Sequence, residues 1–226
     1  MLSPGITFLL ILFAMVVAVI AQVRVRSAFN KYGRVRTQSG RTGAEVAQQV
    51  LLDAGIHDVE IVRGQSYLGD HYDPSKKVLC LSPEVYDSES VTAVGVAAHE
   101  CGHAIQHAGA YAPLKARMAV VPLTMVASQF IPFIFLGGLF FGYVRPLLDL
   151  GIAVYAILTV FQLITLPVEF DASRRARLVL TQNGIVTVAE SAGVSKVLNA
   201  AALTYVAAFL STLFYLLHLI ALRGRD

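Results

Sequence analysis

The chain has 226 residues, of which 56% are hydrophobic, and its mean hydropathy is +0.64. An ordinary water-soluble domain is excluded, because such domains contain about 45–50% apolar residues. The net charge of +3 is small, and no motif of a nucleic-acid-binding module is present, so we expect no nucleic-acid partner. The two cysteines, Cys80 and Cys101, form no spaced framework, and we expect both to be free thiols in a reducing compartment.

The first apolar run covers residues 4–21, carries no charge, and has about the length that crosses the core of a bilayer. No basic residue precedes it, which disfavours a cleaved signal peptide. Six basic residues follow it within twenty positions: Arg24, Arg26, Lys31, Arg34, Arg36 and Arg41. The positive-inside rule therefore predicts a transmembrane helix over 4–21, with its N-terminus outside and the following segment, 22–117, in the cytoplasm.

Segment 22–117 reads as a globular domain. Thr42 and Glu45 form a capping box before apolar residues at helical spacing, and Gly55 is placed to end that helix. Residues 59–62 and 77–81 are short β-prone runs separated by a polar loop, which predicts a small sheet or a hairpin. The edge of this sheet offers a site for an extended peptide.

A second helix is predicted to begin after Asp87 or Ser88 as its cap and to end near Gly109. Only residues 91–98 of it are uninterruptedly apolar, far short of about 20 residues, so we expect it to lie beside the bilayer. It contains the sequence His99-Glu100-Cys101-Gly102-His103.

This HExxH pattern is typical of zinc hydrolases. Positions i and i+4 lie one turn apart on the same helical face, so His99 and His103 can bind one metal ion while Glu100 stands beside it as a base. With six His in the chain, chance predicts roughly 0.005 such matches. The sequence therefore predicts a catalytic metal site with Glu100 as its general base.

Three further uncharged runs are long enough to span a bilayer: residues 118–143, 150–168 and 197–222. The short connection at 144–149 makes a hairpin of the first two, so residues 169–196 return to the side of His99. The predicted fold class is a mainly α membrane protein, with about four transmembrane helices and a cytoplasmic zincin-like α+β domain that carries a small β-sheet. In this topology Arg223 and Arg225 would lie outside the cell, which is contrary to the positive-inside rule.

A catalytic zinc ion usually has three protein ligands, so the motif requires one more. We predict Glu169, at the start of a cytoplasmic helix over 169–196. Asp171 is turned by roughly 200° around that helix and is not expected to bind the same ion. The alternative is that both acids only balance the arginines that follow them.

Four blocks of the sequence resemble the YugP-like neutral zinc metallopeptidases, a family of bacterial membrane proteins. The blocks are Asp70-His71-Tyr72-Asp73-Pro74, Leu81-Ser82-Pro83-Glu84-Val85-Tyr86, Val96-Ala97-Ala98-His99-Glu100-Cys101-Gly102-His103-Ala104-Ile105-Gln106 and Pro167-Val168-Glu169-Phe170-Asp171-Ala172-Ser173-Arg174-Arg175-Ala176. The resemblance covers nearly the whole chain and implies a membrane-bound zinc protease.

The segment from Glu169 to Arg174 is also similar to the third-ligand helix of the HtpX and CAAX-prenyl type membrane metalloproteases. In those proteins the Glu that matches Glu169 binds zinc, and an Asp usually stands where this chain has Ser173. Histidine ligands normally donate their second N–H to such an acceptor. In this chain Asp171 or a backbone carbonyl is expected to take that place.

The expected activity is that of an integral-membrane zinc metalloendopeptidase with one Zn²⁺ per chain, acting on polypeptides that are membrane proteins or lie near the bilayer. His71, Tyr72 and Arg174 are open candidates for stabilising the oxyanion, and we name His71 as the additional catalytic residue. The expected location is the bacterial plasma membrane, with the site on the cytoplasmic side.

The competing interpretation is a catalytically silent zinc-binding membrane scaffold or sensor. It is disfavoured because metal binding alone does not require Glu100. Zinc transport is disfavoured too, because His218 is the only ionisable residue in the four apolar runs. We expect His218 to face a neighbouring helix, and His107 to be a solvated residue at a helix end.

Overall fold

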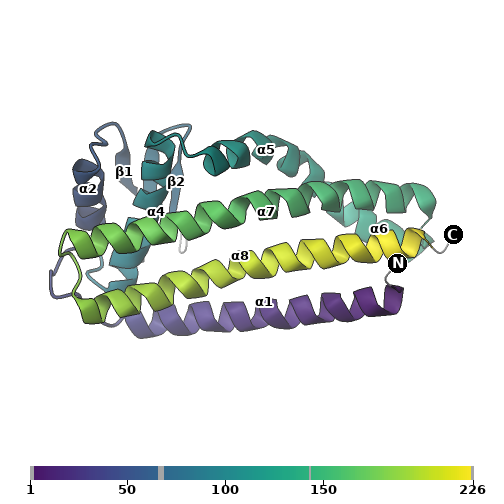
Figure 1. Ribbon diagram of the computed structural model, residues 1–226, viewed down its shortest axis with the longest axis horizontal. Coiled ribbons are helices and arrows are strands. Elements are labelled where there is room, and N and C mark those ends of the chain that lie inside the picture. The colour runs from purple at the N-terminus through teal and green to yellow at the C-terminus, as the bar shows by residue number, and fades with distance from the viewer. Residues whose placement is uncertain (1–2, 66–68, 143, 225–226) are drawn as a thin grey trace. The chain divides into compact units, whose positions relative to one another are not determined.

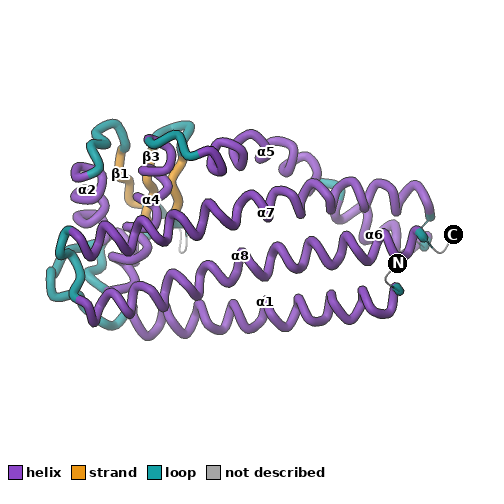
Figure 2. Tube along the Cα trace, in the orientation of Figure 1, coloured by secondary structure: helices purple, strands orange, loops and turns teal. Residues whose placement is uncertain are grey.

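The computed structural model describes residues 3–65, 69–142 and 144–224. Most of them are helical, and the strands are confined to residues 60–81 (Figures 1 and 2). The elements are α1 Pro4–Tyr32, α2 Gly43–Asp53, β1 Glu60–Arg63, β2 His71–Asp73, β3 Val78–Leu81, α3 Pro83–Tyr86, α4 Val91–Ala108, α5 Ala112–Ser128, α6 Ile131–Phe141, α7 Arg145–Gln182 and α8 Val188–Arg223. The predicted mainly α class with a small sheet is confirmed.

The chain divides into two compact units. The first, here called the helical unit, consists of Met1–Gln22, Lys115–Pro167 and Leu203–Asp226. The second, here called the mixed unit, consists of Val23–Leu114 and Val168–Ala202 and contains the sheet.

Four helical stretches are long and apolar enough to cross a membrane, as predicted: Pro4–Tyr32, Ala112–Phe140, Arg145–Gln182 and Val188–Arg223. Large apolar side chains of the helical unit are exposed, among them Leu9 (64%), Phe133 (68%) and Phe140 (72%). Such a surface is unfavourable in water and suits contact with lipid.

Within the helical unit, α8 packs against both α1 and α7 (Figure 1). His218 Nδ1 lies 2.9 Å from Thr7 Oγ1, and the rings of Tyr155 and Tyr215 have centroids 4.3 Å apart. The prediction that His218 faces a neighbouring helix is confirmed.

The second predicted span, 118–143, consists of two helices in the structure. The chain leaves α5 through a turn at residues 129–130 and enters α6 with Pro132 in its first turn. Pro132 has no N–H for the carbonyl four residues earlier, that of Ser128 at the end of α5, and its ring would clash with that carbonyl in a continuous helix, which explains the interruption. Tyr143, the last residue of the predicted span, lies outside the described residues.

The predicted helix over 169–196 is not a separate element. Residues 169–182 continue α7 without a break, and α8 begins at Val188 after a turn that contains Gly184 in a left-handed conformation (φ +63°). Glu169 is therefore held in the middle of a 38-residue helix rather than at the first turn of a new one.

The sheet of the mixed unit has the strand order β1-β3-β2. β1 pairs with β3 in parallel, from Glu60 opposite Val78 to Arg63 opposite Leu81, and β2 pairs with β3 antiparallel. A small sheet was predicted, but the alternative of a hairpin between the two β-prone runs is wrong. The intervening loop supplies β2, and the hairpin joins β2 to β3 (Figure 2).

Two helices of the mixed unit, α2 and α4, begin at side-chain caps. The predicted capping box is confirmed, because Thr42 Oγ1 accepts from Glu45 N–H at 3.2 Å and Glu45 accepts from Thr42 N–H at 2.8 Å. The cap of α4 is Ser90, which accepts from the N–H of Ala93, so the prediction of Asp87 or Ser88 is wrong.

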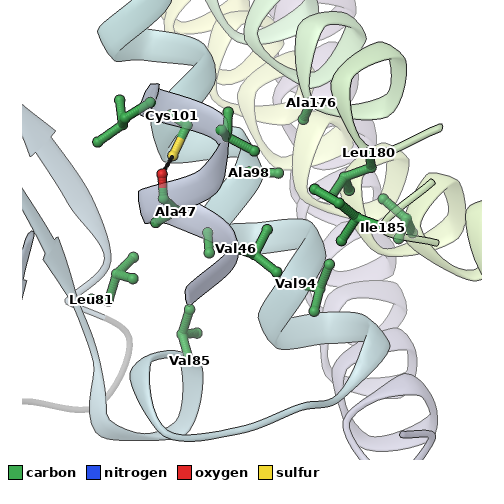
Figure 3. Close-up of a cluster of buried hydrophobic side chains, with 14 of the residues drawn as sticks. Val46, Ala47, Leu81, Val85, Val94, Ala98, Cys101, Ala176, Leu180 and Ile185 are labelled. Atoms are coloured by element: carbon green, nitrogen blue, oxygen red, sulfur yellow. Dashed lines mark hydrogen bonds between the residues drawn. The ribbon is translucent and has the colours of Figure 1, made fainter. Parts of the chain in front are cut away.

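One hydrophobic core joins α2, β3, α4, α7 and α8 in the mixed unit (Figure 3). Val46, Leu81, Val94 and Leu180 are all at most 1% exposed there. The buried thiol of Cys101 donates to the carbonyl of Ala47, which ties α4 to α2. Both cysteines are free, as predicted.

Candidate metal centre

α4 presents two imidazoles on one face. The rings of His99 and His103 meet edge to face, with centroids 4.8 Å apart and planes inclined by 83°. This juxtaposition follows from the i, i+4 spacing in an unbroken helix.

α7 brings a carboxylate to the same place. Glu169 Oε2 lies 3.3 Å from His99 Nε2 and 3.6 Å from His103 Nε2. Among the described residues, these three side chains form a group whose ligand atoms all lie within 4.8 Å of one another.

The spacing of these atoms fits a zinc ion. Tetrahedral coordination at about 2.0–2.2 Å places neighbouring ligand atoms about 3.3–3.6 Å apart. Both distances that involve Glu169 fall in this range. Two imidazole nitrogens and one carboxylate oxygen are also a donor set that zinc accepts in catalytic sites, where a fourth position stays open. His99, His103 and Glu169 can therefore hold the metal.

The approach of α4 to α7 depends on Gly102. A Cβ atom at Gly102 would lie 2.7 Å from the carbonyl oxygen of Ala172, closer than real Cβ contacts. Ala172 is itself fully buried. Gly102 lies between the two histidines in α4. The close approach of the two helices that Gly102 permits therefore also places Glu169, one turn before Ala172, at the metal-binding face.

His103 is oriented by a fully buried amide. Its Nδ1 lies 3.1 Å from Gln106 Oε1, while Gln106 Nε2 donates to the carbonyl of Val168 at 2.8 Å and to Asp171 Oδ2 at 3.0 Å. Since the Nε2 group of Gln106 donates twice, its Oε1 accepts the Nδ1 proton of His103. Nε2 of His103 is then left without a proton and can face the metal.

His99 is oriented by a hydroxyl: Ser173 Oγ lies 3.1 Å from His99 Nδ1. Ser173 thus contacts His99 itself, from the position at which the HtpX and CAAX-prenyl type proteases usually carry an Asp. Asp171, which was expected from the sequence to take the place of that Asp, contacts Gln106, which in turn contacts His103. It accepts from Gln106 and is paired with Arg175 at 2.5 Å and with Arg174.

The charges around His103 oppose the effect of its burial. Burial lowers the pKa of His103, but the carboxylates of Glu169 and Glu100 outweigh this effect, so that the pKa is raised. Glu100 is buried, and among the described residues no hydrogen bond or ion pair engages its carboxylate. A buried carboxylate that forms neither a hydrogen bond nor an ion pair is suited to accept a proton.

The candidates for oxyanion stabilisation are placed outside the three-residue group. His71 is exposed on the edge strand β2, with Nδ1 2.7 Å from the carbonyl of Gly69. The hydroxyl of Tyr72 lies 2.9 Å from His107 Nδ1, so His107 is a partner of the sheet rather than a solvated helix end. Arg174 is paired with Asp171.

Two residues of the site were not recognised from the sequence. Gln106 stands three positions after His103, one turn along the same face, and this spacing was a usable signal for a contact with the His103 ring. Gly102 carried no such signal, because its packing partner Ala172 is 70 positions away in the sequence.

Taken together, the structure defines a mainly helical protein with four helices suited to cross a membrane and a His-His-Glu cluster that can hold a metal ion. Residues 7–224 match the family described as "Putative neutral zinc metallopeptidase", and the chain belongs to this family. The resemblance inferred from the sequence blocks is confirmed.

A curated relative is 47% identical over 208 residues, which cover 91% of this chain and 92% of the relative. It is the "Putative membrane protease YugP" of Bacillus subtilis (strain 168). No solved structure matches the chain.

Proposed function

We propose that the protein is an integral-membrane zinc metalloendopeptidase. The observation that carries this proposal is the convergence of His99, His103 and Glu169, contributed by two helices, with the buried Glu100 directly after His99 in α4. The family supports both the metal and the protease activity, and the name of the Bacillus relative supports the protease activity.

Each residue has a definite task in peptide hydrolysis. A bound zinc ion supplies Lewis acidity that activates water and polarises the scissile carbonyl. Glu100 accepts the proton of the attacking water on its carboxylate and then donates it to the leaving amine. Gln106 and Ser173 hold the two imidazoles by their Nδ1 atoms, so that the Nε2 atoms stay directed toward Glu169.

Negative charge that develops on the carbonyl oxygen needs a second donor besides the metal. We propose His71 as this donor, because its ring is exposed on β2, the edge strand along which an extended substrate can lie. Since Nδ1 donates to the carbonyl of Gly69, Nε2 donates to the oxyanion from the imidazolium form of the ring. In a His71→Ala variant we expect kcat to fall while zinc content is unchanged. An unaltered kcat would remove His71 from the mechanism and leave Tyr72 and Arg174.

The proposed substrates are membrane proteins or segments close to the bilayer, and the proposed location of the site is the cytoplasmic side of the bacterial plasma membrane. Four helices long and apolar enough to cross a membrane, and the basic residues after the first apolar run, support this assignment. Cleavage of soluble peptides with no cleavage of any membrane-inserted substrate would contradict it.

The test of the function combines zinc analysis with proteolysis, using detergent-purified wild type and three variants. We expect about one zinc per chain in the wild type and in Glu100→Gln, with proteolysis lost in Glu100→Gln. Glu169→Ala should lose the zinc, whereas Asp171→Ala should keep most of it. Undiminished proteolysis in Glu100→Gln would disprove the mechanism, and zinc binding with no proteolysis in any preparation would favour a silent scaffold or sensor.

A further inference from the structure

The mixed unit contains a cavity of about 500 Å³ that the proposed peptidase mechanism does not use. It is lined by the last two turns of α1, by α3 and by the first turn of α4. Val25, Phe29 and Val85 form apolar walls. None of the three metal-binding residues lines it.

Thr92, in the first turn of α4, is the unusual residue of this cavity. It is 6% exposed, and its hydroxyl has no hydrogen-bond partner among the described residues. The N–H groups on either side are satisfied: Val91 donates to the carbonyl of Val35 at 2.9 Å, and Ala93 donates to Ser90 Oγ at 3.2 Å. The N–H of Thr92 itself has no such acceptor in the part of the chain that the structure describes. Native proteins rarely bury a polar side-chain atom in this state, so the hydroxyl of Thr92 is available to donate to a ligand in the cavity. The N–H groups in the first turn of a helix have no acceptor within the helix, so the N–H of Thr92 can donate to the same ligand.

The charged groups of the cavity favour an anion. Arg26 and Arg34 line it, and the described residues offer neither of them an ion pair. The N-terminus of α4 adds the positive end of a helix dipole.

Two carboxylates also line the cavity, but neither neutralises these groups. Asp70 accepts from the N–H of Ser82 at 2.7 Å and from its hydroxyl at 3.2 Å, so both of its oxygens are already engaged. Glu84 is exposed. In the part of the chain that the structure describes, the hydroxyl and N–H of Thr92 and the guanidinium groups of Arg26 and Arg34 therefore remain available to a ligand.

We propose that this cavity binds a phosphate-bearing ligand. Its oxygens accept from the N–H and hydroxyl of Thr92 and from the guanidinium groups of Arg26 and Arg34, and its apolar part packs on Val25 and Phe29. Guanidinium pairs match phosphate geometry well, because several planar donors meet several oxygens. The headgroup of an anionic phospholipid and a soluble phosphate compound share this chemistry.

The experiment uses the full chain in detergent, as wild type and as Thr92→Val and Arg26→Gln. Arg24→Gln is the matched control, because Arg24 is exposed on the same helix and does not line the cavity. Inorganic phosphate is titrated in thermal unfolding, and native mass spectrometry compares phosphatidylglycerol with phosphatidylcholine. For the wild type we expect saturable binding of at least one anionic probe, weakened about tenfold or more by Arg26→Gln and Thr92→Val but not by Arg24→Gln.

The two probes identify the source of the phosphate. A preference for phosphatidylglycerol over phosphatidylcholine that follows the same pattern of variants supports a lipid headgroup. A response to inorganic phosphate without that preference supports a soluble ligand. The proposal is overturned if the wild type binds neither probe saturably, if Thr92→Val and Arg26→Gln bind as the wild type does, or if Arg24→Gln weakens binding equally. The melting temperature without ligand shows that each variant is folded.

Discussion

At the residue scale, the proposed chemistry depends on which nitrogen of each histidine carries the proton. Gln106 uses its whole amide group in three hydrogen bonds, and this fixes the Nδ1 proton of His103. The hydroxyl of Ser173 is both a donor and an acceptor, so it positions His99 without dictating its tautomer. Of the two imidazoles, His103 is therefore the more firmly prepared for metal binding.

The first prediction concerns Gln106→Met, which keeps the side-chain volume and removes the amide. Zinc affinity should fall about 10–100-fold, because outer-shell partners of histidine ligands contribute at this level. Competition with a chelator measures it, and Gln48→Met, at an exposed position of α2, is the control. Equal zinc affinities in Gln106→Met and wild type would show that His103 does not need the amide.

The second prediction concerns the pH dependence of stability and rests on Asp70. Burial raises the pKa of Asp70, and the two hydrogen bonds from Ser82 only partly offset this effect. A carboxyl whose pKa is higher in the folded than in the unfolded state stabilises the fold at low pH, and this stabilisation is lost as the pH rises through the folded-state pKa. In Asp70→Asn the group is neutral at every pH. The melting temperature of this variant, measured relative to wild type, should therefore be higher at pH 7.5 than at about pH 4, close to the ordinary pKa of an Asp side chain. A difference independent of pH would contradict this account.

At the scale of elements, the site is a contact between two helices with small residues at their interface. Gly102 of α4 lies against Ala172 of α7, and Ala176, one turn further along α7, is also buried. Small side chains let the helix axes approach, and this approach brings Glu169 within reach of both histidines.

The third prediction compares two glycines of α4. In Gly102→Ala the new Cβ atom would meet the backbone of Ala172 at 2.7 Å, so the helices must separate, at a cost of about 1–3 kcal/mol. In Gly95→Ala it would meet only the side chain of Val194, at 3.3 Å, which can adjust. We expect Gly102→Ala to lower both zinc content and melting temperature, with Gly95→Ala close to wild type in both. Full zinc content in Gly102→Ala would show that the site tolerates a wider helix spacing.

At the scale of the whole molecule, a metal held by α4 and α7 couples binding to folding. The ligands come from positions 66 to 70 residues apart, and the unfolded chain offers no such preformed site. Binding to the folded state alone raises its stability.

The fourth prediction is that chelation lowers the melting temperature of wild type and of Glu100→Gln by similar amounts. Glu169→Ala, already depleted of zinc, should not respond. Differential scanning calorimetry in detergent with and without chelator measures this. A chelator response in Glu169→Ala equal to that of wild type would mean that the stabilising metal is bound elsewhere.

The fifth prediction concerns membrane orientation. Ser39 follows the basic residues after the first apolar run, and Val144 stands between α6 and α7. We expect a single Cys at position 144 to be labelled by an impermeant reagent from outside intact cells, and a Cys at position 39 only after permeabilisation, in a background with Cys80 and Cys101 replaced by Ser. Labelling of position 39 in intact cells would invert the topology.

Features that depend on neighbours in the chain were predictable. The capping box at Thr42, the pairing of His99 with His103 and the four long apolar helices each arise from contacts or composition within a few turns, so local periodicity reports them. The location of Glu169 was also anticipated, since a catalytic zinc ion needs a third ligand and few acids were available.

The remaining features depend on partners that are distant in the sequence. The parallel pairing of β1 with β3, the contact of Gly102 with Ala172 and the roles of Gln106 and Ser173 all require knowing which segments meet. The unpartnered Thr92 beside two arginines is visible only once α1 and α4 lie together. Residue types and spacing specify what a segment can form, whereas packing between segments decides which polar groups find a partner and which are left for a ligand.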